Sequence, residues 1–392
     1  MSRAATQTSS SAKRHRALAM HASLTAAPPA ALLGSRRPTA ARLRARASAR
    51  PALARRAAPQ PPRASAADDA SSDDTADAPI APAERKMVVA VTGATGFVGK
   101  ALVARLQSEG HEVRVLTRNA LAARLAMPQA ALAGAKFYAW DTMKGKIEWY
   151  DAVRGCTGVV NLAGAPIANP WSEAYKKTLV DSRLRATKRV ADAINALPAD
   201  ERPTLVTSSA VGYYGVSKRA EGFDETSRPG KDFLADLCVR WEAAARRAKT
   251  TTTVVRTGVV LEKDGGALGK MLPAFQLYTG GPLGAGDQYV SWVHRDDLTR
   301  LVCEALREPE KYEGVVNGVA PTPVTMAGLC ESVAEATGRP NWLPVPGFAL
   351  RAVLGEGATV VLDGQKVLPK RAEALGFEFQ YEEIDEAMEA IV

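Results

Sequence analysis

Residues 87–99 have the sequence Met-Val-Val-Ala-Val-Thr-Gly-Ala-Thr-Gly-Phe-Val-Gly. The apolar, β-branched first half predicts a strand buried on both faces, and the glycines that follow predict a tight turn. An amphipathic pattern begins at Lys100 and ends at Gly110, which predicts a helix. A strand, a glycine turn and a helix in this order form the motif that binds the phosphates of a dinucleotide.

Each glycine of this turn has its own physical role. Gly93 permits the tight turn, Gly96 lets the backbone approach a pyrophosphate, and Gly99 allows the helix to pack closely. The spacing is G-x-x-G-x-x-G, and the N-terminus of the helix offers unpaired N–H groups to phosphate oxygens. The cofactor contacts expected from the turn are Gly93, Thr95, Gly96, Phe97, Val98 and Gly99.

The second predicted strand, residues 111–117, bears on the choice of cofactor. It ends in Thr117 and Arg118, where an NAD enzyme carries Asp or Glu to hold the ribose 2′-hydroxyl. Because an arginine can bind a 2′-phosphate instead, we expect NADP, bound in part by Thr117 and Arg118. The alternative is an exposed arginine that opens the next helix. A third predicted strand, residues 136–140, leads to Asp141, which we expect to face the adenine.

Strand and helix patterns continue to alternate along the chain. This alternation predicts an α/β fold, a Rossmann-like doubly wound parallel sheet whose carboxyl ends gather the ligands. Further strands are predicted at 158–164, 203–208 and 251–256, and helices at 172–197 and 231–249. The cofactor contacts expected at these strand ends are Leu162, Ala163, Gly164, Ser208, Arg256 and Gly258. For Arg256 the alternative is an ion pair with a carboxylate.

The first 66 residues differ in composition from the rest. They hold 13 Lys and Arg, 21 Ala and no acidic or aromatic residue, which is typical of a disordered organelle transit peptide. We expect a chloroplast protein of the stroma or the stromal face of the inner envelope, with the mitochondrion as the alternative. The remaining 326 residues carry 38 basic against 42 acidic side chains, a net charge of −4. This mildly acidic body argues against nucleic-acid binding.

Four domains or segments are predicted. They are a transit peptide at 1–66, an acidic linker at 67–86, an NADP-binding Rossmann domain at 87–261, and a smaller C-terminal substrate lobe with an extension at 262–392, from which 289–320 return to the Rossmann core. No apolar stretch reaches the roughly 18 residues of a membrane span. A terminal amphipathic helix, residues 381–392, leaves open whether it contacts a membrane peripherally or packs on the protein.

Several motifs together resemble the atypical, epimerase-like branch of the extended short-chain dehydrogenase/reductases, the SDR39U1 family. They include residues 92–99, 161–164, 208–215 and 291–296, and the branch's C-terminal extension is similar to residues 339–379. The resemblance covers residues 87–392. It implies a dinucleotide domain with a substrate lobe, and plant members that are plastid proteins linked to plastid division. No established substrate comes with it.

The resemblance also implies a catalytic serine and, one turn of helix apart, a tyrosine and a lysine. Ser209 matches the serine, which orients the substrate oxygen. Tyr214-Gly-Val-Ser-Lys218 matches Y-x-x-x-K in letters, but it begins five residues after Ser209 and contains a glycine, so a long helix is not expected there. The predicted helix at 231–249 instead has Cys238 and Glu242 at the right spacing. The sequence therefore departs from standard dehydrogenase chemistry.

Substitute groups are therefore considered. The candidate catalytic residues are Ser209, Tyr213 and Tyr214, and Glu242 is a further candidate if burial raises its pKa. For Cys238 we favour helix packing over reactivity. For His294 we favour a junction between a strand and a helix, with Asp296 or Asp297 capping a helix from Leu298. The few scattered cysteines and histidines predict no metal site.

Two functions follow as hypotheses. The first is an NADP-dependent oxidoreductase or epimerase of the atypical extended type, acting on an unknown small metabolite in the plastid. The second is a non-catalytic NADP-binding protein that regulates plastid division through partner proteins.

Overall fold

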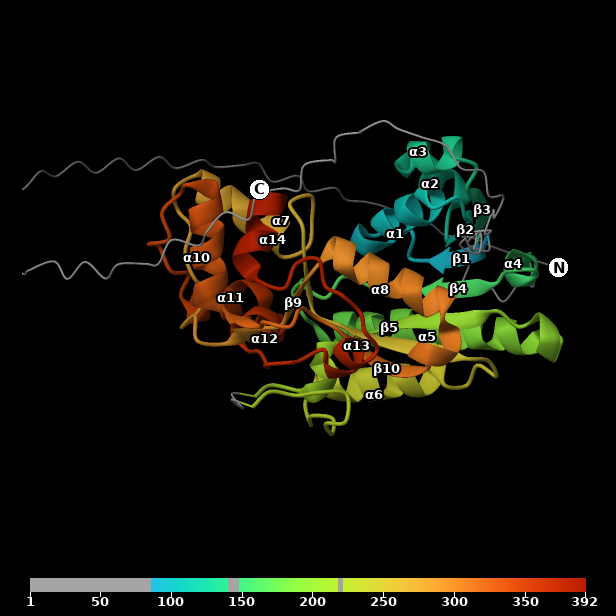
Figure 1. Cartoon of the computed structure of the whole chain (residues 1–392). Helices are drawn as coiled ribbons and strands as arrows, with labels where there is room; N and C mark the ends of the chain where they lie inside the picture. The colour runs from blue at the N-terminus through green and yellow to red at the C-terminus, as the bar shows by residue number, and fades with distance from the viewer. Residues whose placement is uncertain (1–85, 140–147, 218–220) are drawn as a thin grey trace, which may run out of the picture. The chain divides into compact units, whose positions relative to one another are not determined.

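A seven-stranded sheet organises the computed structural model, which describes residues 86–139, 148–217 and 221–392 (Figure 1). All paired strands run parallel, in the order β10-β6-β5-β4-β1-β2-β3. The strands are β1 (Val88–Thr92), β2 (Glu112–Thr117), β3 (Lys136–Ala139), β4 (Gly158–Asn161), β5 (Thr204–Ala210), β6 (Thr252–Thr257) and β10 (Gly314–Gly318). The predicted doubly wound parallel sheet is confirmed.

Helices cover both faces of the sheet because strand side chains alternate between them. Val89 and Val91 lie in one buried cluster with residues of α1 (Phe97–Ser108) and α8 (Arg295–Arg307). Ala90 lies in the other cluster with residues of α5 (Glu173–Ala196). Helix α6 (Phe233–Ala245) packs beside α5 on that second face (Figure 1). In a sheet covered on both faces, ligands bind at the carboxyl ends of the strands.

Side-chain caps fix where the helices begin. Ser172 caps α5 by accepting from Tyr175 N, and Asp232 caps α6 by accepting from Ala235 N. Helix α8 begins at Arg295, three residues before the predicted Leu298. The predicted caps Asp296 and Asp297 are wrong, because the His294 imidazole itself accepts from Asp296 N at 3.1 Å.

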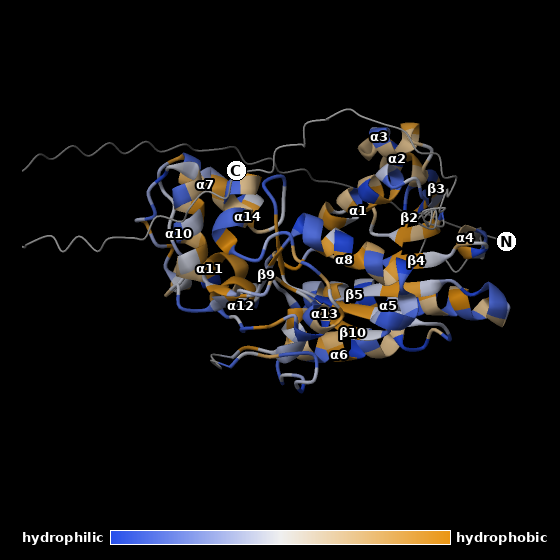
Figure 2. Cartoon of the chain, in the orientation of Figure 1, coloured by the Kyte–Doolittle hydropathy of each residue, from blue (hydrophilic) through white to orange (hydrophobic). Residues whose placement is uncertain are grey.

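A third buried cluster forms the core of the C-terminal lobe. It joins α7 (Leu268–Gln276), α10 (Met326–Thr337) and α14 (Ile384–Ile391). The apolar side of α14 is buried there through Ile384, Met388 and Ile391, so this helix packs on the protein rather than lying free. Figure 2 shows that apolar residues recur along these lobe helices and alternate with polar ones. No helix of the described ranges has the length and apolar character needed to cross a membrane.

The remaining elements are short. They are α2 (Ala120–Ala126), α3 (Pro128–Leu132), α4 (Glu148–Val153), η1 (Ala199–Glu201), η2 (Val211–Tyr214), β7 (Val259–Leu261), β8 (Tyr289–Val290), β9 (Trp292–His294), α9 (Pro309–Tyr312), β11 (Val324–Thr325), α11 (Gly347–Leu354), η3 (Glu356–Ala358), α12 (Thr359–Leu362) and α13 (Lys370–Ala374).

Candidate active site

The glycine turn after β1 is packed too tightly for any side chain. Gly93 has a φ of +67°, and a Cβ there would lie 2.6 Å from the carbonyl carbon of Leu162. A Cβ on Gly99 would lie 2.3 Å from the Gly93 oxygen, which also accepts a hydrogen bond from Gly96 N at 2.9 Å. The backbone of the turn therefore packs directly against the backbone of α1 and of the loop after β4.

The N-terminus of α1 presents unpaired donors. Gly96 is the N-cap residue and supplies no side-chain acceptor, and the first turn contains no acidic residue. Within the described ranges, the N–H groups of Phe97, Val98 and Gly99 donate to no acceptor. Thr95 and Gly96 are exposed. This arrangement suits a bound anion, since the helix dipole places partial positive charge at the same point.

Arg118 lies at the carboxyl end of β2 and is exposed, with no ion pair among the described residues. The next helix, α2, is capped not by Arg118 but by Asn119, which accepts from Ala122 N at 3.0 Å. The guanidinium of Arg118 is therefore available to a ligand. Asp141, predicted to face the adenine, lies outside the described residues.

A buried polar layer runs beneath the strand ends. Thr92 of β1 donates to Asn161 of β4 at 2.7 Å, and the Asn161 amide donates to Thr207 of β5 at 3.1 Å. The same amide donates to Thr187 of α5 at 2.8 Å, and Trp241 of α6 donates to that hydroxyl at 2.8 Å. Sequence reasoning missed this layer, although Asn161 signalled it as a polar residue within an apolar strand. It locks three strand ends to both helices of that face.

The predicted serine belongs to a buried ionic cluster. Ser209 Oγ donates to Glu242 Oε1 at 2.9 Å, and its side chain is buried. Arg256 grips the same carboxylate with Nε at 2.8 Å and Nη2 at 3.0 Å. Arg246 also donates to Glu242 Oε2, at 3.1 Å. The alternative interpretation of Arg256, an ion pair with a carboxylate, is what the structure contains.

Two tyrosines complete this cluster in different ways. Arg256 Nη1 donates to Tyr214 Oη at 3.0 Å, and Tyr214 in turn donates to Asn317 Oδ1 at 2.7 Å. Burial raises the pKa of Tyr214 to about 12, and only 3% of the residue is exposed. Tyr213 is half-buried, and its ring centroid lies 3.3 Å from the Arg256 guanidinium carbon. Its hydroxyl has no hydrogen-bond partner among the described residues.

Cys238 occupies the tyrosine position of the expected helix, and it is inert in this fold. Only 3% of the residue is exposed, and its Sγ lies 3.7 Å from the Ala210 oxygen. Burial, reinforced by the nearby Glu242 charge, raises the pKa of the thiol to about 11. The interpretation of Cys238 as a packing residue is confirmed.

The remaining predicted contacts lie at the strand ends. Leu162 and Ala163 are half-buried, Gly164 is exposed, and Ser208 is half-buried on the opposite face of β5 from Ser209. At Gly258 a Cβ would lie 2.3 Å from the Ser291 oxygen, so the packing of β7 beside β9 requires a glycine there. The residues described contain no group of three His, Cys, Asp or Glu that could hold a metal ion.

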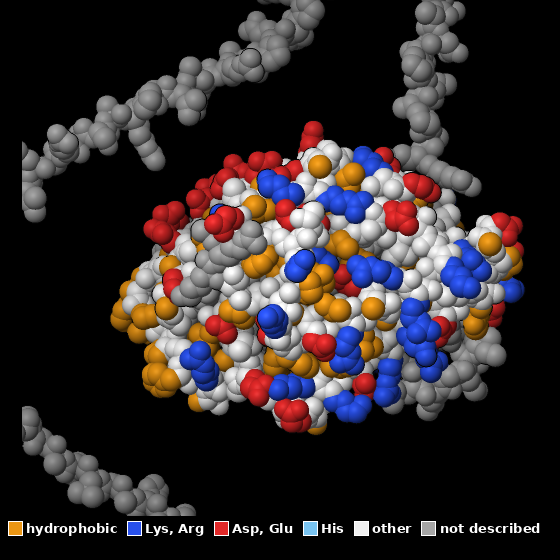
Figure 3. All heavy atoms as spheres, turned by 90° about the horizontal axis from the view of Figure 1, so that it is seen from below, with side chains coloured by type: hydrophobic (Ala, Val, Ile, Leu, Met, Phe, Trp, Pro, Cys, Tyr) orange, Lys and Arg blue, Asp and Glu red, His pale blue; other side chains and the backbone are white. Residues whose placement is uncertain are grey.

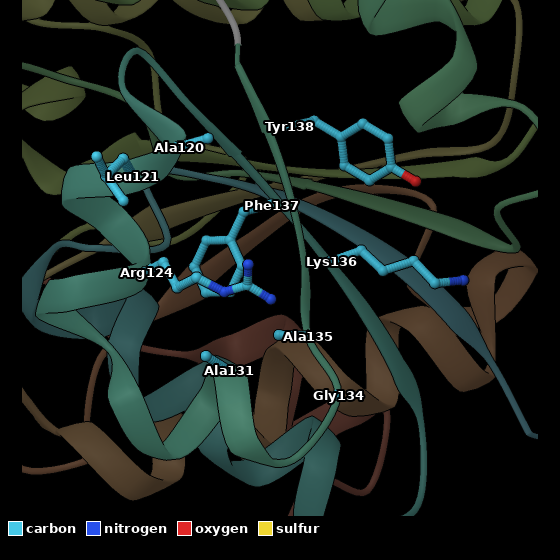
Figure 4. Close-up of a pocket in the computed structure, with 9 residues that line it drawn as sticks. All are labelled: Ala120, Leu121, Arg124, Ala131, Gly134, Ala135, Lys136, Phe137 and Tyr138. Atoms are coloured by element: carbon cyan, nitrogen blue, oxygen red, sulfur yellow. The ribbon is translucent and has the colours of Figure 1, made fainter.

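A hollow of about 640 Å³ lies apart from these residues, at the sheet edge formed by β3 and bounded by α2 and α3 (Figure 4). Arg124 and Phe137 lie on one side of the strand, with the guanidinium carbon 5.9 Å from the ring centroid, and Lys136 and Tyr138 point to the other. None of the predicted site residues lines it.

Comparison with known proteins places this site in a family. The sequence profile described as the NAD dependent epimerase/dehydratase family matches residues 89–317, more than half of the chain. The chain belongs to this family. A second profile, a domain of unknown function (DUF1731), matches residues 345–391, which confirms the expected C-terminal extension.

Relatives with the SDR39U1 name support the narrower branch. The chloroplastic SDR39U1 homolog of Arabidopsis thaliana is 51% identical over 312 residues, covering 79% of this chain and 88% of that protein. Human epimerase family protein SDR39U1 is 38% identical over 313 residues, covering 78% of this chain and 100% of that protein. The resemblance to the SDR39U1 branch is confirmed.

Solved structures of family members share the fold. Human SDR39U1, solved with NADPH, has a TM-score of 0.69 and 37% identity, covering 78% of this chain and 99% of that one. A nucleoside-diphosphate sugar epimerase from Corynebacterium glutamicum has a TM-score of 0.61 and 29% identity, covering 78% of this chain and 58% of that one.

Proposed function

We propose that this chain is an NADP-dependent oxidoreductase or epimerase that acts on a small metabolite in the plastid. One observation carries the proposal: within the described ranges three N–H groups of α1 have no acceptor, and they lie next to a turn that requires glycine at 93 and 99. The human relative solved with NADPH supports the choice of cofactor.

The residues present fit NADP. Gly93, Gly96 and the N–H groups of residues 97–99 would hold the pyrophosphate, because a phosphate oxygen needs donors and a path free of Cβ atoms. Arg118, exposed and unpaired, would hold the 2′-phosphate. When bound, the cofactor supplies or accepts the hydride, and the protein must supply the proton.

Tyr213 is the group we assign to proton transfer. Its hydroxyl is uncommitted, whereas the Tyr214 hydroxyl is held between Arg256 and Asn317. The Arg256 guanidinium carbon lies 3.3 Å from the Tyr213 ring centroid, and this cation–π contact holds the ring in place. Ser209 and Glu242 then act as positioning residues. Glu242 binds Arg256, and Ser209 donates to Glu242.

Localisation and partners are part of the proposal. The leader composition and the chloroplastic name of the Arabidopsis relative support import into the chloroplast, to the stroma or the stromal face of the inner envelope. A link to plastid-division proteins and peripheral contact with a membrane are part of the same proposal. Exposed large apolar side chains of the lobe favour such contact; they are Leu277, Tyr278, Trp342, Leu343, Phe348 and Val353. Figure 3 shows apolar side chains interspersed with charged ones on one face of the molecule.

A second function, a non-catalytic NADP-binding regulator, is favoured by one observation. Helix α6 carries Cys238 and Glu242 where family catalysis uses tyrosine and lysine, and both side chains are buried and engaged.

The test is NADPH oxidation by the full-length protein, followed by absorbance, with a filtered small-molecule extract of plastid stroma. Tyr213→Phe is expected to lower the rate by about 10²- to 10⁴-fold, the usual contribution of a positioned proton donor, while NADPH affinity stays unchanged. Tyr214→Phe is the matched variant, and we expect it to lower stability more than rate. NADPH that binds but is never consumed would favour the regulator, after epimerisation has been excluded by analysis of the extract.

A further inference from the structure

Arg183 on α5 is a cation that has no counterion among the residues that the structure describes. Its Nη1 donates to Leu179 O at 3.2 Å and its Nη2 to Ala165 O at 3.1 Å. An arginine carries five N–H donors, so most of the fork has no acceptor within the described part of the chain. No carboxylate there forms an ion pair with it.

Neighbouring arginines are neutralised by carboxylates. Arg256 pairs with Glu242, Arg295 with Glu262 and Asp264, and Arg185 with Asp181. Arg183 differs from them, because its two acceptors are neutral carbonyls. Arg183 is half-buried, and burial lowers the pKa of its guanidinium. Partial burial of a guanidinium that has no carboxylate partner among the described residues costs free energy, and a charged ligand can offset that cost.

The guanidinium is held in a fixed orientation. It lies over the Trp241 ring at 5.2 Å from the centroid, and Trp241 is itself buried and hydrogen-bonded to Thr187. On another side a Cβ at Gly164 would lie 3.2 Å from its central carbon, so the absence of a side chain at Gly164 leaves room for it. Because these contacts already restrict the Arg183 guanidinium, it can bind an oxyanion with little further loss of side-chain entropy.

The position of Arg183 is that of a ligand site. Gly164 and Ala165 lie three and four residues after the end of β4, and Trp241 lies one turn from Cys238, which contacts Ala210 at the end of β5. Arg183 therefore lies at the carboxyl ends of two central strands, where ligands of doubly wound sheets bind.

We propose that Arg183 binds an anionic group of the substrate, a carboxylate or a phosphoryl group. This inference rests on the proposed function, and it names the substrate class: a small organic acid or phosphate ester rather than a neutral alcohol or sugar. Both groups present oxygens to the planar guanidinium fork in the same way.

The test titrates full-length protein with sodium acetate and, separately, with inorganic phosphate at constant ionic strength. Tryptophan fluorescence reports binding, because Trp241 stacks on the guanidinium. Saturable binding of at least one anion is expected, weakened about tenfold or more in Arg183→Met. Arg183→Lys should lose part of that affinity, because it keeps the charge without the fork. Saturation by acetate alone assigns a carboxylate, and saturation by phosphate alone assigns a phosphoryl group.

Arg185→Met is the matched control, since it removes a cation two residues away on the same helix and should leave anion affinity unchanged. The proposal is overturned if neither anion saturates the native protein, or if Arg183→Met and Arg185→Met behave alike. If Arg183→Met does not fold, the lysine variant decides. NADPH affinity is measured separately. If the native protein does not bind NADPH, the proposed function is wrong and the anion result is unaffected. If Arg183→Met loses affinity for NADPH but not for the anions, Arg183 is not a substrate-binding residue.

Discussion

Glu242 is the residue on which the candidate site depends most. Only 1% of it is exposed, yet it accepts hydrogen bonds from Ser209, Arg246 and two nitrogens of Arg256. A carboxylate at this depth is tolerated because its lone pairs are satisfied and a guanidinium neutralises it. Glu242 also holds Arg256 in place, and the Arg256 guanidinium is the cation that lies against the Tyr213 ring.

Replacing Glu242 by Gln should therefore destabilise the protein strongly. The change leaves Arg256 buried without its counterion, and breaking one side of a buried pair costs about 3–5 kcal/mol. Denaturant unfolding of the full-length protein measures the loss. The matched control is Asp236→Asn on the same helix, which breaks an exposed pair with Arg240 and should cost about 1 kcal/mol or less. Equal losses in the two variants would contradict a stabilising role for the buried cluster.

For single residues, the sequence predicted features set by nearby residues, such as the glycine turn. It did not predict contacts between residues that are far apart in the chain. The glycine turn could be predicted because its three glycines lie within seven residues. The alternative of a carboxylate partner for Arg256 could be stated, but its identity as Glu242 could not, because the partner comes from a different element. Arg183 could not be recognised either, because only the folded structure shows that it donates to carbonyls and has no carboxylate partner among the described residues.

At the scale of single elements, α1 and α10 offer a direct comparison. Each has 12 residues and a glycine at its third position, Gly99 in α1 and Gly328 in α10. An alanine Cβ at Gly99 would meet the Gly93 oxygen at 2.3 Å, whereas at Gly328 its nearest contact would be at 3.5 Å. Alanine would therefore clash with backbone at position 99, whereas it would fit without a clash at position 328.

Gly99→Ala should lower stability and weaken NADPH binding together, because the turn must move to admit the methyl group. Gly328→Ala should raise stability by up to about 1 kcal/mol, the helix-propensity gain of alanine, with NADPH binding unchanged. Thermal unfolding and the fluorescence of bound NADPH measure both quantities. Retained NADPH affinity in Gly99→Ala would show that the cofactor does not depend on this turn.

Helix α8 predicts a dependence of stability on pH through its cap. His294 is 3% exposed, and burial lowers its pKa from 6.5. Protonation would also remove the acceptor that caps Asp296 N. The ring therefore stays neutral when folded, and the unfolded chain takes up the proton first. The stability is complete above about pH 6.5 and falls as the pH drops below it. The ring stacks on Tyr381, and the charged groups around it are Asp296, Asp297, Glu262 and Arg295.

His294→Asn separates this effect from other titrations, because asparagine caps a helix without titrating. When the pH is lowered from 7.5 to 5.5, the denaturant midpoint of unfolding should fall further for the native protein than for the variant. The lost cap alone is worth about 0.5–2 kcal/mol. All other ionisable groups, including His111, are common to both proteins. Parallel pH profiles would show that His294 contributes nothing to acid sensitivity.

Elements were predicted better than their ends. The helix predicted at 172–197 differs from α5 by one residue at each end, because Ser172 and Leu197 are its cap residues. The start of α8 was wrong, because a histidine cap is uncommon and two aspartates beside it offered stronger signals.

At the scale of the whole described body, the extension is joined to the sheet by hydrogen bonds. Asn317 of β10 donates to Leu368 O at 2.9 Å, and Arg371 donates to Val315 O of the same strand at 3.1 Å. Gln365 donates to Val211 O at 2.8 Å, next to the candidate tyrosines. These contacts span more than 50 residues of sequence, so composition alone could separate a lobe but could not show how firmly it is attached.

We therefore expect the Rossmann sheet and the lobe to unfold together. Met388 of α14 is fully buried in the lobe cluster, and Met388→Ala should cost about 2–5 kcal/mol. Hydrogen exchange should then accelerate by about thirtyfold or more in β1 and β4 as well as in α10, because the slowest amides exchange through global unfolding. Val392→Ala, at the exposed end of the same helix, should change exchange little. Acceleration confined to α10 and α14 would instead mean that the lobe opens independently, and that the substrate site can be exposed without unfolding the cofactor site.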